Sequence, residues 1–427
     1  MKRGLTRWPK GLDEWLAYQE QLHRKRVDLG LGRIRKVFQK LLPKGPLPLT
    51  ITVGGTNGKG SVVALLEAIL KAAGYRIGAY TSPHLLRYNE RIRIDASPIR
   101  DEPLCQAFER VERAREGEPL SFFEFGTLAA LDLFARHRVE VQILEVGLGG
   151  RLDAVNIVDA DAAAITTIDL DHKQWLGASR EAIALEKAGI LRPHRPAVIG
   201  DPDPPKTLLD YIAHHQIPAT LFRRDFDYQV GDGSWRWWNR KEAIDRLPPL
   251  RLKGWHQYQN AAVVLELLSR IRPILPVSQE AIRKGLAETV LPGRYQWIGG
   301  TPEILLDVAH NPQSARALAG YLREEVAGRR IVALFSILGD KDIEAVVAPL
   351  VPVVDLWVIA PLESERAAPL ETIERALKAA GARRVVSRDR VGQAYAEAIA
   401  HASPQDLLLV FGSFLIVAEI LMVRNCF

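Results

Sequence analysis

The chain has 427 residues, of which 47% are hydrophobic and 25% are charged, a balance typical of a folded, water-soluble protein. Its net charge of +6 suits anionic ligands such as nucleotides, but the basic residues are spread out and predict no nucleic-acid surface. The two cysteines, Cys105 and Cys426, lie far apart and argue against a disulfide framework. We expect a cytoplasmic protein, because no apolar stretch resembles a signal peptide and none reaches the roughly 18 residues of a membrane span.

The first part of the chain alternates helical and extended patterns. Residues 11–42 carry an apolar stripe at helical spacing, formed by Leu12, Trp15, Leu16, Tyr18 and Leu22. Expected strands follow at 49–53, 75–82, 139–147, 162–168 and 195–201. Expected helices lie at 61–73, 122–136 and 179–189. This alternation predicts a mostly parallel sheet with helices on both faces.

Residues 218–252 differ in character from what precedes them. Two expected antiparallel strands, 220–230 and 234–240, are joined by a glycine-containing turn. Trp235, Trp237 and Trp238 allow a stacking platform for bases. Few basic residues surround them, so a small β-element packed on the domain is the favoured interpretation. Helices are expected at 257–272 and 278–288.

A second α/β pattern begins after the segment "LPGRYQW" at 291–297. Its expected strands lie at 303–310, 329–339, 353–361, 382–387 and 405–413. The sequence therefore predicts an α/β protein of two domains. Residues 1–290 would form a P-loop-containing, mostly parallel sheet domain that includes the N-terminal helix and the small β-element. Residues 291–427 would form a smaller Rossmann-like domain.

The stretch "ITVGGTNGKGS" at 51–61 joins the first expected strand to a helix. Its glycines allow a tight turn that exposes backbone N–H groups, and the helix dipole favours a phosphate there. Lys59 would reach the β- and γ-phosphates, and Ser61 would hold Mg²⁺. The usual P-loop places lysine and hydroxyl residue next to each other, whereas Gly60 separates them here. A glycine-rich turn without a ligand is the alternative.

Two polar residues at strand ends are candidate metal ligands. Glu145 ends one expected strand and His172 follows the next, so both would approach Ser61 at the carboxyl edge of the sheet. Two oxygens and a nitrogen, completed by water and phosphate, suit Mg²⁺, although histidine is an unusual ligand for so hard a cation. Taken singly, a capping carboxylate and a loop histidine explain these two residues equally well.

Polar residues also follow three expected strands of the second domain. Asp307 and His310 end one of these strands, residues 340–342 ("DKD") follow another, and Ser413 follows the last. So many polar strand ends are unusual in a purely structural domain. They lead us to expect a ligand cleft between the domains.

Together these motifs resemble the bifunctional dihydrofolate synthase/folylpolyglutamate synthases, the folate branch of the Mur-ligase superfamily. The resemblance runs from about Leu12 to about Ala418. It rests on "GTNGKGS" (55–61), "YTSPHLLRYNERIRI" (80–94), "FFEFGT" (122–127), "LEVGLGGRLDAVNIVDAD" (144–161), "LDHKQWLG" (170–177), "EKAGI" (186–190), "LPGRYQ" (291–296), "LDVAHNP" (306–312), "DKD" (340–342) and "FGSF" (411–414). The inserted Gly60 is a mark of that superfamily.

The resemblance implies ATP and two Mg²⁺ ions. The ATP-binding residues would be Gly55, Thr56, Asn57, Gly58, Lys59, Gly60, Ser61, Asn260, Arg294, Asp307 and His310. Ser61 and Glu145 would hold one metal ion, and His172 would hold the second together with Lys187 as a carbamate. Lys59, Lys187 and His172 would be the catalytic residues. The helical pattern alone predicts an exposed surface lysine at position 187, so the resemblance reverses that interpretation.

On the substrate side, the resemblance implies a pterin pocket and an amide-forming reaction. Its residues would be Thr81, Ser82, Pro83, His84, Phe123, Asp153 and Ala154. Two positions depart from the family pattern: Val155 replaces a common threonine, and Leu415 replaces an aromatic residue or histidine. The first departure removes a hydroxyl beside the pterin pocket, and the second alters contacts in the C-terminal domain.

The implied enzyme activates a carboxylate with ATP and joins it to L-glutamate. Dihydropteroate and folates would be the acceptors, and the protein would be a monomer without a nucleic-acid or membrane partner. Alternatives are a monofunctional dihydrofolate synthase or folylpolyglutamate synthase, or another Mur-type amino-acid ligase. A nucleotide-regulated nucleic-acid-binding protein is a further alternative, which the diffuse charge disfavours.

Overall fold

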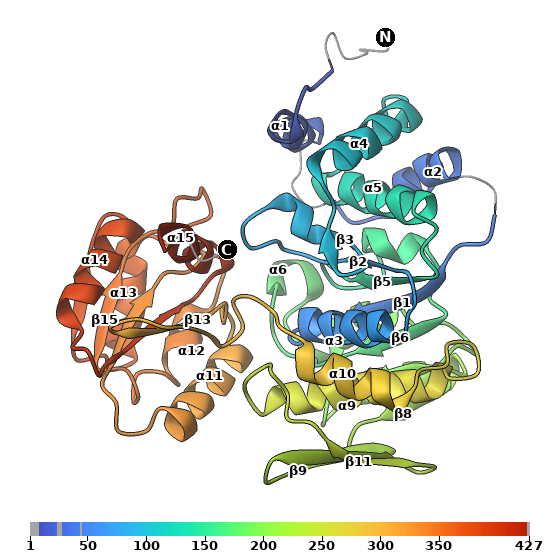
Figure 1. Ribbon diagram of the computed structural model, residues 1–427. Coiled ribbons are helices and arrows are strands. Elements are labelled where there is room, and N and C mark those ends of the chain that lie inside the picture. The colour runs from blue at the N-terminus through green and yellow to red at the C-terminus, as the bar shows by residue number, and fades with distance from the viewer. Residues whose placement is uncertain (1–7, 24–27, 43–44, 425–427) are drawn as a thin grey trace. The chain divides into compact units, whose positions relative to one another are not determined.

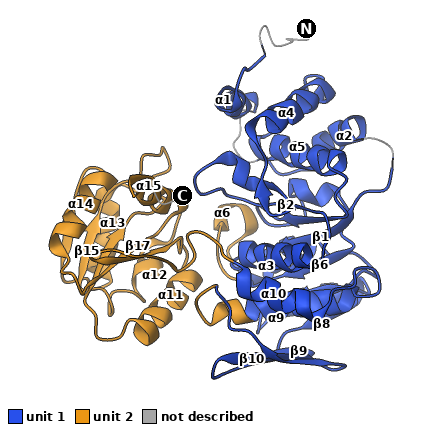
Figure 2. Cartoon of the chain, in the orientation of Figure 1, with its two compact units in different colours: residues 1–168, 179–251, 259–289 blue, residues 169–178, 252–258, 290–427 orange. Residues whose placement is uncertain are grey.

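The computed structural model describes residues 8–23, 28–42 and 45–424. The chain forms two compact units, shown in different colours in Figure 2. Unit 1 comprises residues up to 168 together with 179–251 and 259–289, and unit 2 comprises 169–178, 252–258 and the residues from 290 onward. A short segment that follows a unit 1 strand, residues 169–178, thus belongs to unit 2 by its contacts.

Unit 1 is built on an eight-stranded sheet with the order β4-β3-β2-β5-β1-β6-β7-β8. Strands β3 and β4 are antiparallel to their neighbours, and the others are parallel. The strands are β1 (Leu49–Gly54), β2 (Ile77–Tyr80), β3 (Ile92–Ile94), β4 (Ser97–Pro98), β5 (Val141–Glu145), β6 (Ala162–Ile165), β7 (Ala197–Ile199) and β8 (Ala219–Leu221). β1 and β5 are almost fully buried, as expected for central parallel strands.

Helices cover this sheet on both faces (Figure 1). The helices of unit 1 are α1 (Leu12–Leu22), α2 (Gly32–Leu41), α3 (Lys59–Ala72), α4 (Asp101–Arg115), α5 (Phe122–Arg136), α7 (Arg180–Ala188), α8 (Lys206–His214), α9 (His256–Ile271) and α10 (Gln279–Glu288). Short 3₁₀ turns lie at Tyr88–Arg91 and Ala154–Ile157. Helices α3 and α10 run side by side, and a Cβ on Gly285 would lie 2.5 Å from Ile69 Cγ1, so only glycine permits this approach.

The prediction of one helix over residues 11–42 is wrong, because α1 ends at Leu22 and α2 begins at Gly32. Residues 24–27 of that range lie outside the described part of the chain. Glycine weakens a helix interior, and Gly30, with a φ of +155°, lies in the connection between the two helices. The apolar stripe itself was correctly assigned, since Trp15 is fully buried.

A buried glutamine in α1 carries a stability prediction. Gln19 is 1% exposed, and neither polar atom of its amide has a hydrogen-bond partner in the described part of the chain. An unpaired buried polar group destabilises a fold by about 1–3 kcal/mol. Gln19→Leu is therefore expected to raise the free energy of unfolding by about that amount, as measured by urea denaturation. Gln21→Leu, on an exposed position of the same helix, should change it by less than about 0.5 kcal/mol. Destabilisation by Gln19→Leu would contradict this account.

A small antiparallel sheet in unit 1 contains the tryptophan cluster. Its strands, in the order β11-β10-β9, are β9 (Phe226–Gly231), β10 (Ser234–Asn239) and β11 (Ala243–Leu247). Trp235 and Trp237 are 1% and 0% exposed, which confirms the packing interpretation for these two residues and leaves only Trp238 partly exposed. Asn239 ties the sheet to α9 by donating to Glu266 at 3.0 Å.

The single strand expected at 220–230 is two strands in different sheets. β8 ends at Leu221 in the main sheet, whereas β9 begins at Phe226 in the small one. A turn separates them, in which Arg223 has a φ of +65° and the Asp225 carboxylate accepts the Leu221 N–H at 2.9 Å. The β-rich composition predicted extended backbone correctly but did not reveal this turn.

Unit 2 contains a six-stranded sheet in the order β12-β13-β17-β14-β15-β16, parallel except for β12. Its strands are β12 (Gln296–Ile298), β13 (Glu303–Asp307), β14 (Ile331–Phe335), β15 (Leu356–Ile359), β16 (Val385–Ser387) and β17 (Leu407–Phe411). Its helices include α6 (Lys173–Leu176), α11 (Pro312–Glu325), α12 (Ile343–Val347), α13 (Leu370–Ala379), α14 (Val391–His401) and α15 (Phe414–Val423). Phe335, Trp357 and Phe411 form the aromatic centre of its core.

Both units have mostly parallel sheets flanked by helices, so the predicted α/β fold class is confirmed. Within the described ranges, no helix is both long and apolar enough to cross a membrane.

Candidate active site

The glycine loop connects the end of β1 to the start of α3. Gly55 and Gly58 have φ values of +145° and +88°, where side chains other than glycine are strained. A Cβ on Gly55 would lie 1.8 Å from Thr166 Oγ1, and one on Gly58 would lie 2.5 Å from Asn260 Oδ1. Both glycines are therefore required by conformation and by space. The second contact places Asn260, a predicted ATP-binding residue, directly against the loop.

The end of β6 holds the loop in place. Thr56 donates its N–H to the Thr167 carbonyl at 2.7 Å, and Asn57 donates its N–H to Thr167 Oγ1 at 3.2 Å. Thr166 Oγ1 donates to the Asn57 carbonyl at 2.5 Å. From the sequence, Thr166 and Thr167 were predicted to lie in a strand, with no role in the site. Two hydroxyl residues together at the carboxyl end of a strand were the available signal.

Lys59 brings a positive charge to the loop. Its ammonium donates to the Gly55 and Thr56 carbonyls at 3.1 Å each, so the charge lies over the turn. Lys59 is also the first residue of α3, and Gly60 and Ser61 follow in the first turn, where the helix dipole is positive. A cation and a helix N-terminus at one glycine turn form an environment suited to phosphate.

Oxygen donors gather beside the loop. The register pairs Glu145 at the end of β5 with Val53, one residue before the glycine segment begins. Glu145 Oε2 accepts the backbone N–H of Ser82 at 3.2 Å. Ser61 and Glu145 are only 3% and 5% exposed. The hard oxygens of a carboxylate and a hydroxyl fit Mg²⁺.

Few side chains are available as metal ligands in this region. Among the described residues, no group of three or more His, Cys, Asp and Glu side chains is placed to hold a metal ion. Mg²⁺ is commonly held by one or two carboxylates, with substrate phosphates and water completing the shell. The residues present therefore fit a metal ion that binds together with a nucleotide.

Lys187 near the end of α7 is buried, at 3% exposed, so the surface-lysine interpretation of its helical pattern is wrong. The end of α7 packs against the loop that follows β5. Arg151 donates its N–H to the Glu186 carbonyl at 2.7 Å, and a Cβ on Gly150 would lie 3.1 Å from Lys187 Cα. The double glycine of that loop allows the helix this close.

The same loop carries two of the predicted pterin-side residues, Asp153 and Ala154, and packs against a third, Phe123 of α5. A Cβ on Gly147 would lie 2.7 Å from Phe123 Cζ, so the Phe123 ring covers the start of the loop. The Tyr80 ring lies 5.6 Å from the Phe123 ring. Further along the loop, Asp153 accepts the N–H groups of Leu148 and Val155 at 2.8 and 3.0 Å. Ala154 follows and is also buried.

Burial of Asp153 has a pH consequence. Desolvation raises the pKa of its carboxyl to about 6, against the partial opposition of its backbone hydrogen bonds. A raised folded-state pKa contributes stability that is present below the unfolded-state pKa and is lost as the pH rises through about 6. Relative to Asp153→Asn, the wild type should therefore lose about 1.5 kcal/mol of unfolding free energy between about pH 5 and about pH 8. Denaturation of both proteins at the two pH values measures this, and a constant difference would contradict it.

Glu124 is a candidate that the sequence analysis missed. It lies beside Phe123 in α5 and is 4% exposed. Its Oε2 accepts from Arg33 Nε and from the Ser121 N–H at 2.8 Å each, while Oε1 has no hydrogen-bond partner in the described part of the chain. A buried acceptor without a protein partner is unusual, which marks Glu124 as a candidate site residue. A carboxylate within the aromatic run "FFEF" was the sequence signal.

His84 lies in the loop after β2 that begins with Thr81, Ser82 and Pro83. Its Nδ1 accepts from Arg91 Nε at 2.8 Å, which fixes the neutral tautomer with the proton on Nε2. Burial, reinforced by the Arg91 charge, lowers the pKa of His84 to about 4. The Arg91 guanidinium also lies 5.2 Å from the Tyr88 ring centre. His84 is therefore a neutral donor at physiological pH.

In unit 2, Asp307 and Arg294 lie close enough to interact. The Asp307 carboxylate accepts the N–H groups of Tyr295 and Ala309 at 3.1 and 2.8 Å, and burial raises its pKa to about 6 against the opposing charge of Arg294. The Arg294 guanidinium lies 5.0 Å from the Phe414 ring centre.

His172 and His310 are the other predicted site residues of unit 2. Both lie near Asp171, whose carboxylate accepts from Lys341 Nζ at 2.7 Å. Burial of Asp171 opposes its ionisation, but the charges of His172, Lys341 and His310 hold its pKa well below the usual range. The Asp171–Lys341 pair was not predicted, although both residues stand in motifs that were noted.

Unit 1 thus brings together the glycine loop, Glu145 and the pterin-side residues, as well as Asn260. The predicted residues of unit 2 are His172, Arg294, Asp307 and His310. Of the two departures from the family pattern, Val155 is fully buried, and Leu415 is 45% exposed at the start of α15.

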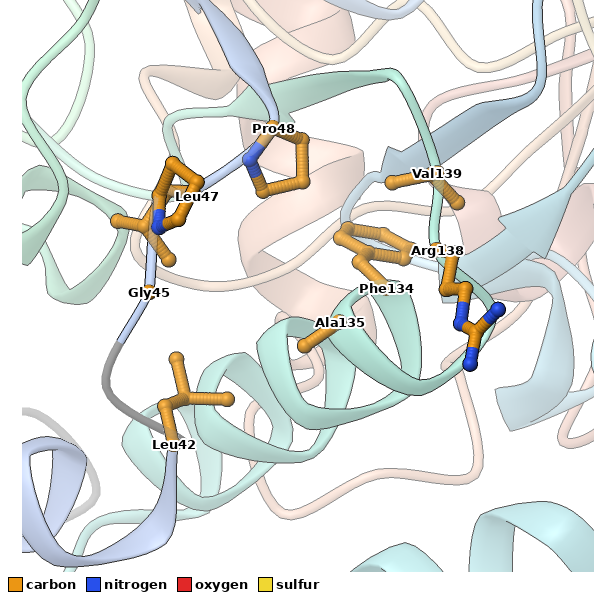
Figure 3. A pocket seen from close by; sticks show the side chains of 9 residues that line it. Leu42, Gly45, Leu47, Pro48, Phe134, Ala135, Arg138 and Val139 are labelled. Carbon is orange, nitrogen blue, oxygen red and sulfur yellow. The ribbon is translucent and has the colours of Figure 1, made fainter.

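A pocket of about 320 Å³ lies at the amino ends of β1 and β5, the edge of the sheet away from the glycine loop (Figure 3). Its lining includes Leu42, Pro48, Phe134, Arg138 and Val139. It contains none of the predicted site residues, and we assign no ligand to it.

Comparison with known proteins identifies the family. A model described as "Mur ligase middle domain" matches residues 53–228, and one described as "Mur ligase, glutamate ligase domain" matches residues 293–414. A "Dihydrofolate synthase/folylpolyglutamate synthase" of Escherichia coli K12 is 44% identical over 96% of this chain and 95% of its own length.

Comparison with solved structures identifies the same family. "E.coli FolC in complex with DHPP and ADP" has a TM-score of 0.92 at 42% identity, covering 97% of this chain and 98% of that one. A bifunctional folylpolyglutamate synthase/dihydrofolate synthase "with Mn, AMPPNP and L-Glutamate bound" has a TM-score of 0.90 at 41% identity, with the same coverage. The chain therefore belongs to the dihydrofolate synthase/folylpolyglutamate synthase family of Mur-type ligases.

Proposed function

We propose that this chain is an ATP-dependent ligase that joins L-glutamate to dihydropteroate and also extends folates with glutamate. The observation that carries the proposal is the common location of the phosphate loop and the pterin-side residues in unit 1. Asp153 is close enough to Lys59 for the lysine charge to oppose the rise in its pKa. The acceptor would therefore bind beside the phosphates that activate it.

The chemistry follows from this arrangement. An oxygen of the acceptor carboxylate attacks the γ-phosphorus of ATP, and the bond from that phosphorus to the β-phosphate oxygen breaks. ADP departs, and the acceptor remains as an acyl phosphate. The amine of L-glutamate then attacks the acyl carbon, loses a proton and expels phosphate. Lys59 and the N-terminus of α3 would stabilise the charge that develops on the transferred phosphoryl group. The half-buried Phe123 ring and the buried Ala154 would help keep water from the acyl phosphate.

Metal ions complete the proposal. Ser61 and Glu145 would hold one Mg²⁺, and His172 with carbamylated Lys187 would hold a second; bound Mg²⁺ neutralises charge on phosphate oxygens. Lys187 is only 3% exposed, which is unusual for an unmodified lysine and supports a role inside the site. A carbamate signal in ¹³C NMR after growth or incubation with labelled bicarbonate, absent from Lys187→Arg, tests the modification.

The nucleotide would be positioned by four further residues: Asn260, Arg294, Asp307 and His310. Support for Asn260 is its contact with Gly58. Support for Arg294 is a guanidinium beside the Phe414 ring, a combination suited to a base or a phosphate.

The ligands bound in related structures support the proposed substrates and the proposed nucleotide. One of the similar structures is a complex with DHPP and ADP, and the other has Mn, AMPPNP and L-glutamate bound. We place the enzyme in the cytoplasm, where ATP and glutamate are available, and expect a monomer. Light scattering during size-exclusion chromatography measures the oligomeric state.

The deciding experiment is an assay of the purified chain with ATP, Mg²⁺ and L-glutamate. Dihydropteroate and tetrahydrofolate are compared as acceptors, with ADP release and glutamylated product measured together. Turnover with both is the expected result. Turnover with one acceptor alone would show a monofunctional enzyme, and none with either would overturn the proposal.

A further inference from the structure

A half-buried arginine joins two segments of unit 1 that carry site residues. Arg93 lies in β3, and its side chain is 17% exposed. Its Nε donates to both carboxylate oxygens of Glu67 at 3.1 and 2.9 Å, and a terminal nitrogen reaches the same carboxylate at 2.8 Å. Glu67 lies on α3, the helix that begins in the glycine loop. One side of the guanidinium is thus fixed to the phosphate-binding helix.

The other terminal nitrogen of Arg93 holds the loop of residues 81–86, which we call the acceptor loop. It donates to Thr81 Oγ1 at 2.9 Å and to the Glu90 carbonyl at 2.8 Å. The Glu90 carboxylate in turn accepts the N–H groups of Leu85 and Leu86 at 2.8 Å each. The Thr81 hydroxyl is therefore engaged by Arg93, which gives this predicted substrate-binding residue a structural partner.

The acceptor loop contains groups that need accurate placement. Its Ser82 N–H reaches Glu145, the candidate metal ligand, and His84 presents its Nε2 proton from the same loop. A buried ion pair adds little net stability compared with apolar side chains, so its value lies in the geometry that it fixes. The arginine fork binds the carboxylate and the loop at once, which the single charged group of a lysine does not do.

We propose that Arg93 is a positioning residue of the ligase reaction, which rests on the function proposed above. Through Glu67 and Thr81 it fixes the acceptor loop to the phosphate-binding helix. It thereby sets the alignment between the acceptor carboxylate and the phosphorus that it attacks. These contacts of Arg93 would affect the alignment of the reacting groups and leave the affinity for the nucleotide unchanged.

The test uses Arg93→Lys in the full chain, with Arg87→Lys as the matched control. Arg87 follows the acceptor loop, and its side chain is 67% exposed in an ion pair with Asp101. Arg93→Lys should lower kcat about 10- to 100-fold, because a small misplacement of reacting groups is costly. The KM for ATP should stay within about twofold, since uniform nucleotide binding is not removed. The control should leave both constants unchanged.

A second variant separates positioning from folding. Glu67→Gln keeps the shape of the side chain and should also lower kcat, and the double variant should lose no more than Arg93→Lys alone, because the residues act as one unit. Melting curves report the folded fraction. Unchanged kcat in Arg93→Lys, additive losses, or a loss that merely follows the unfolded fraction would overturn the proposal. Absence of wild-type turnover would instead overturn the proposed function.

Discussion

Lys59→Ala is expected to lower the rate of acyl-phosphate formation by about 10³-fold, the upper range for removal of one electrostatic stabiliser of a transition state. The Lys59 ammonium is held over the glycine turn by hydrogen bonds to the Gly55 and Thr56 carbonyls. In the proposed reaction it would face the charge that develops on the phosphoryl group. Single-turnover ADP formation in the presence of dihydropteroate measures the step.

Acceptor binding should survive this change, because Phe123 and Asp153 do not depend on the lysine for their positions. Fluorescence titration with dihydropteroate checks that. Lys71→Ala is the matched control, since Lys71 lies exposed near the far end of the same helix and should show wild-type rates. Near-normal turnover in Lys59→Ala would show that the glycine loop is not the phosphate site.

Glu145→Gln is expected to lower kcat about 10²-fold and to raise the Mg²⁺ concentration required for activity. The amide oxygen of glutamine can still accept the Ser82 N–H, so the loop contact is kept while the charge that attracts a cation is lost. Activity measured against Mg²⁺ concentration and Mn²⁺ binding measured by electron paramagnetic resonance should change together.

The matched control for this prediction is Glu140→Gln. Glu140 lies just before the amino end of β5, and its carboxylate also accepts a backbone N–H, that of Arg76 at 2.9 Å. It is exposed and lies at the opposite end of the strand from the glycine loop, so its loss should not affect metal binding. Equal Mn²⁺ affinity in wild type and Glu145→Gln would remove Glu145 from the metal site.

Local sequence determined the fold class and the glycine loop. Alternating strand and helix patterns identified the mostly parallel sheets, because burial on both faces requires continuous apolar strands. The positive φ values of Gly55 and Gly58 are local backbone requirements that glycine spacing reveals directly. The place of Glu145 at a strand end was predicted in the same way, since a strand end is a local feature.

Only the tertiary structure decided which side chains are buried and which distant residues meet. Lys187 has the pattern of a surface lysine, yet the loop after β5 covers it. Arg93 and Glu67 are 26 residues apart, and Arg33 and Glu124 are 91 apart, so neither contact is visible in any local pattern. Burial and ion pairing depend on which elements pack together, and that packing is settled by the whole sheet and its helices rather than by any one segment.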